Sequence, residues 1–130
     1  MEKNTHADRP EIWLRPSPGI SFSVLSTLID IRTMTATPRL GARNGGHPKG
    51  YKPGQVVSLR VFDEKNVERL QRSVRVEAVT IRPLQELTPQ DLHDTVLYHS
   101  WQDAQRDFSF FEKRPVAPNE DASIIEFSYL

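Results

Sequence analysis

The chain has 130 residues, a formal net charge of +0, 37% hydrophobic residues and 26% charged residues, which fits one soluble globular domain. It contains no cysteine, so disulfides, thiolate catalysis and cysteine-ligated zinc are excluded. No apolar run approaches the ~20 residues of a membrane helix, and the first residues lack the basic-then-apolar order of a signal peptide. We therefore expect a cytoplasmic protein with no membrane partner.

The polar residues 1–18 are predicted to form an N-terminal tail and lead-in segment, and residues 19–130 a single domain. Within that domain, Ile20–Phe22 favours a short strand and Ser23–Asp30 a short helix with one apolar side. The stretch Arg32–Thr37 alternates and is rich in β-branched residues, which predicts a strand that Pro38 limits.

A long loop is predicted over Gly41–Pro53, where glycine and proline are concentrated. Loops of this length in a compact domain are usually functional or disordered. The stretch "PGQVVSLRVF" then indicates a turn and a strand, and Ser73–Arg82 a second long strand whose apolar phase slips near Ala78, as in a β-bulge.

The last third of the chain predicts helices followed by a terminal strand. Thr88 is a helix N-cap followed by Pro89, Trp101–Glu112 places its apolar side chains on one stripe, and "ASIIEFSYL" predicts a strand. This order of elements favours an α+β fold, a small mixed β-barrel with flanking helices.

The charges are unevenly distributed. No acidic residue occurs over the 32 positions between Asp30 and Asp63, and that segment carries Arg32, Arg39, Arg43, Lys49, Lys52 and Arg60. Either the protein has a basic face, or the basic segment folds against the later acidic segments and the charges cancel.

Motifs for metals and bound cofactors are missing from the sequence. The four histidines have no helical metal-binding spacing, so we expect no metal site and no cofactor. The stretch "GARNGG" lacks the Lys-Ser/Thr of a phosphate-binding P-loop, and no G-x-S-x-G nucleophile motif occurs.

The remaining candidate site is "IRTMTATPRLGAR", in which Thr33, Thr35 and Thr37 alternate beside Arg32 and Arg39. Threonine hydroxyls donate and accept hydrogen bonds, and arginine offers forked donors suited to phosphate oxygens. Such a strand can bind a nucleotide or a phosphodiester backbone, whereas the alternative is an ordinary half-buried strand rich in threonine.

The stretch "IRTMTATPR" resembles the G-x-K-T-x-T-x-R signature of the ASCH family in the PUA-like superfamily. The resemblance continues through "YKPGQVVSLRVF", "VRVEAVTIRPLQELTPQDL" and "ASIIEFSYL", and covers nearly all of residues 20–130. It implies a PUA-like barrel of five to six strands with two to three flanking helices and a cleft on one side. Many relatives are inferred to bind RNA or nucleotides, and one branch deacylates N4-acetylcytidine with a lysine, a threonine and a glutamate.

Position by position, the resemblance places the motif glycine on Asp30, the family lysine on Arg32, the threonines on Thr33 and Thr35, and the motif arginine loosely on Arg39. The family glutamate falls near Thr95, where Asp94 is the neighbouring acid. An arginine does not release its proton as a buried lysine can, so the catalytic set Thr35, Arg32 and Asp94 departs from the family chemistry.

Three functions remain open. The first is binding of RNA, single-stranded nucleic acid or a nucleotide in a basic cleft, with Trp101 or Tyr98 as a stacking surface and the binding residues Arg32, Thr33, Thr35, Arg39, Arg43, Lys49 and Lys52. The second is hydrolysis of an N4-acylated cytidine or of RNA. The third is a protein-interaction scaffold whose barrel holds no ligand.

Overall fold

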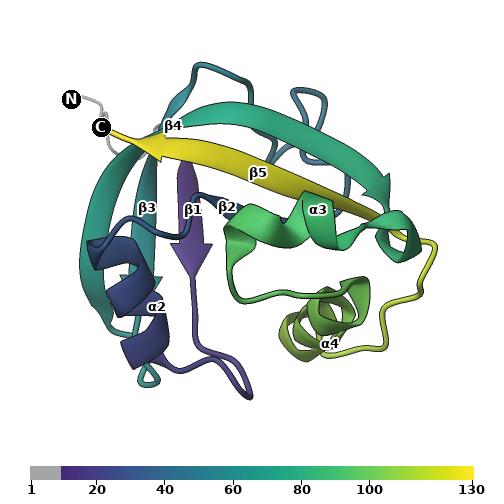
Figure 1. The fold of residues 1–130 in the computed structure, drawn as a ribbon, viewed down its shortest axis with the longest axis horizontal. Helices are drawn as coiled ribbons and strands as arrows, with labels where there is room; N and C mark the ends of the chain where they lie inside the picture. Colours follow the sequence, from purple (N-terminus) through teal and green to yellow (C-terminus); the bar gives the residue numbers. More distant parts are fainter. Residues whose placement is uncertain (1–9) are drawn as a thin grey trace, which may run out of the picture.

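The computed structural model describes residues 10–130, which form one sheet with helices packed against it (Figure 1). In chain order the elements are β1 (Glu11–Leu14), α2 (Phe22–Asp30), β2 (Ala36–Leu40), β3 (Val56–Phe62), β4 (Glu68–Pro83), the 3-10 turn η1 (Leu84–Glu86), α3 (Pro89–Leu92), the 3-10 turn η2 (His93–Thr95), α4 (Trp101–Glu112) and β5 (Asp121–Tyr129). No helix in this part of the chain has the length and apolar character to cross a membrane.

The five strands lie in the order β1-β3-β4-β5-β2, with β1 parallel to β3 and the other pairs antiparallel. The sheet curls into a half-barrel, so that its two edges, β1 and β2, approach each other (Figure 1). This architecture confirms the predicted α+β, PUA-like fold class.

Two apolar clusters build the core. The larger one joins α2 to β1, β3 and β4, with Ile29, Leu59 and Val76 among its fully buried side chains. The second joins α4 and the α3 region to β2 and β5, around Leu84, Leu92 and Ile124. Figure 1 shows α2 under one end of the sheet and α4 under the other end.

The strand expected at Arg32–Thr37 begins later, at Ala36, and extends to Leu40. The backbone of 31–34 instead ends α2: Arg32 has a positive φ of 59°, and the amides of Thr33 and Met34 both donate to the carbonyl oxygen of Leu28. Pro38 is tolerated within β2 because this edge strand pairs on one side only, with β5. The expected threonine row therefore does not form a regular strand face.

Other local predictions have mixed outcomes. The helix Trp101–Glu112, the helix start at Thr88 and the irregularity near Ala78 are confirmed. The strand predicted at Ile20–Phe22 is wrong, because Ile20 makes only an isolated bridge and Phe22 already begins α2. The Ser21 hydroxyl accepts a hydrogen bond from the amide of Val24 as the N-cap, so the helix begins one residue earlier than the expected Ser23.

The lead-in segment also contributes to the sheet. Residues 1–9 of the expected tail lie outside the described residues, but Glu11–Leu14 forms β1. Ile12 and Leu14 are buried in the larger cluster, and Ile12 is paired with Leu59 of β3. The sheet thus begins before residue 19, where the sequence placed the start of the domain, because the alternating Ile12 and Leu14 side chains complete the core.

Candidate ligand cleft

A cavity of about 870 Å³ lies between the two sheet edges and α4. Its walls come from β1, from β2 with the loop that follows it, from the turn before α4, and from the buried side of α4 itself. The loop residues 48–51 line this cavity and do not fill it. A second hollow of about 950 Å³ lies around residues 15–21 and 110–113, but of the two it is the first that is lined by cations of the acid-free segment, which makes it the candidate for ligand binding.

Arg39 lines the cleft from β2. Its guanidinium donates hydrogen bonds to the hydroxyl of Thr37 (2.8 Å), the carbonyl of Pro38 (2.8 Å) and the carbonyl of Trp13 (2.6 Å). Burial lowers the pKa of Arg39 below its ordinary value, while Tyr51 and Tyr98 oppose this change. A guanidinium has five N–H donors, so three protein hydrogen bonds leave donor capacity for a ligand oxygen.

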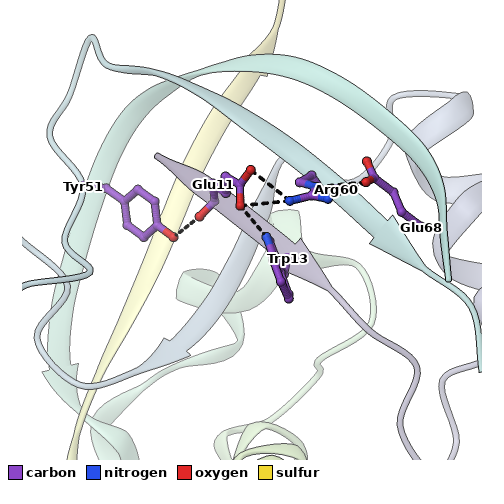
Figure 2. Close-up of polar contacts among 5 residues, drawn as sticks. All are labelled: Glu11, Trp13, Tyr51, Arg60 and Glu68. Carbon is purple, nitrogen blue, oxygen red and sulfur yellow. Dashed lines mark hydrogen bonds and ion pairs between the residues drawn. The ribbon is translucent and has the colours of Figure 1, made fainter. Parts of the chain in front are cut away.

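The β1 edge of the cleft is fixed by hydrogen bonds from several directions (Figure 2). The Glu11 carboxylate accepts from Trp13 Nε1 at 2.8 Å and from Arg60 at 3.0 Å, and Arg60 also pairs with Glu68. The buried Tyr51 donates its hydroxyl to the main-chain carbonyl of Glu11 at 2.6 Å. This network fixes the Trp13 indole, whose ring lies 4.8 Å from the Phe62 ring, and Trp13 is 41% exposed and belongs to the residues that line the cleft.

The basic loop after β2 is tied to the sheet at its start. The Ser123 hydroxyl donates to the carbonyl of Gly41 at 2.6 Å and accepts from the amide of Arg43 at 2.7 Å. The Arg43 side chain is half-buried and donates to the carbonyl of Leu40. Lys49 is exposed at the cleft wall, where long cationic side chains reach outward into solvent.

A carboxylate faces the cleft from α4. Asp107 is 3% exposed and accepts hydrogen bonds from Ser17 (3.0 Å) and from the Tyr98 hydroxyl (2.6 Å). Burial, reinforced by the Asp107 carboxylate, raises the pKa of Tyr98 above its ordinary value, so this phenol keeps its proton. The lining of the cleft therefore includes a cation, Arg39, and a hydrogen-bond acceptor, Asp107.

The turn that carries Tyr98 is strained. Val96 has a φ of 67° and a ψ of −44°, and the amide of Leu97 donates to the carbonyl of Thr95 at 2.7 Å, which closes a γ-turn. A positive φ is unfavourable for a β-branched residue and costs on the order of 1–3 kcal/mol. Leu97 and Tyr98, directly after this turn, both line the cleft. Backbone strain of this kind is common where a fold positions functional side chains.

The binding residues named from the sequence divide into two groups. Arg39, Arg43 and Lys49 line the cleft, while Arg32, Thr33, Thr35 and Lys52 are not among its lining residues. Arg32 is exposed, with its guanidinium 5.9 Å from the centre of the Tyr129 ring.

The expected catalytic set does not gather in the cleft. The amide of Thr35 donates to the main-chain carbonyl of Asp94 at 3.1 Å, so their backbones are adjacent, but the Asp94 carboxylate faces His93 at the surface. Neither of these two residues, nor Arg32, lines the cavity. The reason is the turn at 31–34, which replaces the regular strand on which the expectation rested. Among the described residues, no group of three histidine, aspartate or glutamate side chains has the geometry to hold a metal ion.

Asp107 and Trp13 are the cleft residues that sequence reasoning missed. A signal for Asp107 was present, since it is an acid on the apolar stripe of α4, between Ala104 and Phe108, and all three are buried. Trp13 carried no such signal, because β1 lay inside the segment assigned to the lead-in. The stacking candidates named from the sequence, Trp101 and Tyr98, are partly buried against the second cluster.

This half-barrel with its lateral cleft is an ASCH-like fold. No family model and no curated protein matches the sequence. Among solved structures, protein EF3133 from Enterococcus faecalis, which carries the family label DUF984, aligns with a TM-score of 0.63 at 18% identity over 94% of this chain and 80% of its own. An ASCH domain from Lactobacillus crispatus aligns with a TM-score of 0.63 at 12% identity, over 92% and 77% of the two chains. These similarities support the family resemblance at the level of the fold.

Proposed function

We propose that the cleft binds a nucleotide or the end of a single-stranded RNA. The observation that carries this proposal is that Arg39, Arg43 and Lys49, three cations of the acid-free segment, line one open cavity. The guanidinium groups of arginine and the ammonium group of lysine both donate hydrogen bonds to phosphate oxygens, so a group of such side chains suits a phosphate ligand. With Arg15, the cavity is lined by four cations against the three acids Glu11, Asp107 and Glu112, so cations outnumber acids there although the chain is neutral.

Trp13 supplies an aromatic ring on which a base can stack. Trp13 is partly exposed and is among the residues that line the same cleft, and the guanidinium of Arg15 is 4.8 Å from the centre of its ring. Single-stranded nucleic acids bind to surfaces that combine cations along the backbone with aromatic rings on which bases stack. Trp13 takes the stacking role here, in place of Trp101.

The test uses the intact protein with fluorescently labelled single-stranded RNA oligomers and with nucleoside monophosphates. We expect binding at low salt that weakens as salt rises, because phosphate contacts release counterions. Lys49→Ala and Lys52→Ala form a matched pair, since both lysines are exposed in the same loop but only Lys49 lines the cleft.

The measured quantity is the slope of the logarithm of the binding constant against the logarithm of the salt concentration. Lys49→Ala is expected to reduce the magnitude of this slope by about one, whereas Lys52→Ala should leave it unchanged. Binding that is absent even at low salt would overturn the proposed function. Equal effects of the two substitutions would place binding outside this cleft.

A further inference from the structure

Asp107 is a buried acid whose polar partners are uncharged. Its Oδ1 accepts from the Ser17 hydroxyl and its Oδ2 from the Tyr98 hydroxyl. Within residues 10–130, no lysine, arginine or histidine forms an ion pair with it. A carboxylate that is 3% exposed and lacks a cation is costly to bury, which is typical of groups kept for binding or chemistry.

The two hydroxyl donors do not saturate this carboxylate. An ionised carboxylate offers about four lone-pair positions, and the two hydrogen bonds occupy about half of them. Asp107 is one of the residues that line the cleft, so a ligand that reaches its carboxylate would use the remaining positions. A carboxylate accepts and does not donate, so it selects for N–H or O–H groups on that ligand.

Three separate elements hold Asp107 in place. It projects from α4, Ser17 approaches from the segment between β1 and α2, and Tyr98 comes from the strained turn at Val96. Such support fixes an acceptor at one wall of the cleft, while Arg39 supplies donors at another. A ligand that satisfies both must carry an oxygen acceptor or anionic group and a hydrogen-bond donor.

We infer that Asp107 is a specificity-determining residue that accepts a hydrogen bond from the exocyclic amine of a nucleobase, while Arg39 binds an oxygen of the same ligand. This inference rests on the proposed function and adds the choice of base to it. Adenine, cytosine and guanine each carry an exocyclic amine. Uracil has none, and its N3–H lies between two carbonyl oxygens that a carboxylate repels.

The experiment measures the affinity of AMP, CMP, GMP and UMP for the wild-type protein and for Asp107→Asn. We expect at least one amine-bearing nucleotide to bind about tenfold more tightly than UMP to the wild-type protein. Asparagine has nearly the same shape but presents an N–H₂ group as well as an oxygen. The variant should therefore lose the preference, because its amide donor suits the uracil carbonyl oxygens.

Tyr98→Phe is the companion variant, since it removes a partner of Asp107 but keeps the carboxylate. It should retain the preference for the amine even if overall affinity falls. Equal wild-type affinities for all four nucleotides, or an unchanged preference in Asp107→Asn, would overturn this inference and leave the proposed function standing. A protein that binds none of the four would overturn both. If Asp107→Asn does not fold, equal wild-type affinities for UMP and the amine-bearing nucleotides would still overturn the inference.

Discussion

Arg39 in β2 donates a hydrogen bond of 2.6 Å to the main-chain carbonyl of Trp13 in β1, and these two strands are opposite edges of one sheet. The half-barrel is thus bridged across its open side by a side chain, at a place where the strands themselves do not pair. Because Arg39 also lies in the cleft, the residue that holds the edges together is one of those proposed to bind the ligand.

Replacing Arg39 by lysine should reduce both stability and binding. Lysine keeps the charge but cannot reach three acceptors with one planar group, so the free energy of unfolding should fall by about 1.5–3 kcal/mol. Urea unfolding measures this change. Arg72→Lys is the control, because Arg72 forms an exposed pair with Asp30 and should lose less than about 1 kcal/mol. Equal losses in the two variants would contradict a bridging role for Arg39.

Trp13 should report on ligand binding through its fluorescence. The protein has two tryptophans, so Trp101→Phe leaves Trp13 as the sole indole. RNA oligomers should change the emission of this variant, and Trp13→Ala should weaken binding by about 1–3 kcal/mol, as for one stacked base. Trp13→Phe keeps an aromatic ring and should retain most of the affinity. An emission spectrum that does not respond to saturating RNA would exclude stacking on Trp13.

Gly50 should be essential for the shape of the basic loop. A Cβ at this position would lie 1.7 Å from the carbonyl oxygen of Asn44, so Gly50→Ala forces the backbone beside Lys49 to move. We expect a lower affinity for RNA, measured by titration at low salt. Gly54→Ala is the matched control, because Gly54 has a φ of +87° but open space around it. It should cost about 1–2 kcal/mol of stability and leave affinity unchanged.

The link between α4 and β5 should weaken in acid. Hydrogen bonds from Arg114 and from the amide of Ala117 lower the pKa of Glu120 to about 2, from 4.5. A depressed pKa means that the stabilisation is fully present above pH 4.5 and is lost as the pH falls towards 2. The difference in the free energy of unfolding between wild type and Glu120→Gln should therefore shrink from pH 5 to pH 2. A difference that is constant over this range would contradict the role of the ionised carboxylate.

Local signals were sufficient for several elements. The stripe of Trp101, Ala104 and Phe108 predicts α4, and the phase slip near Ala78 predicts the irregular pairing of β4, because each depends on side chains close in sequence. The strand predicted at Arg32–Thr37 begins four residues too early, because a hydrogen-bonded turn occupies residues 31–34. Whether residues 31–34 extend or end a helix depends on amides that return to the Leu28 carbonyl, and alternation alone does not reveal that turn.

The sequence by itself determined the fold class and the single basic segment, and it named five cations of that segment as binding candidates, of which Arg39, Arg43 and Lys49 line the cleft while Arg32 and Lys52 do not. Only the tertiary structure decided which residues share the cleft. Trp13 and Arg39 are 26 residues apart, and Ser17 and Asp107 are 90 apart, so their meeting depends on how the sheet curls and where α4 packs. The same packing leaves Thr33 and Thr35 outside the cleft and turns the Asp107 carboxylate towards Tyr98.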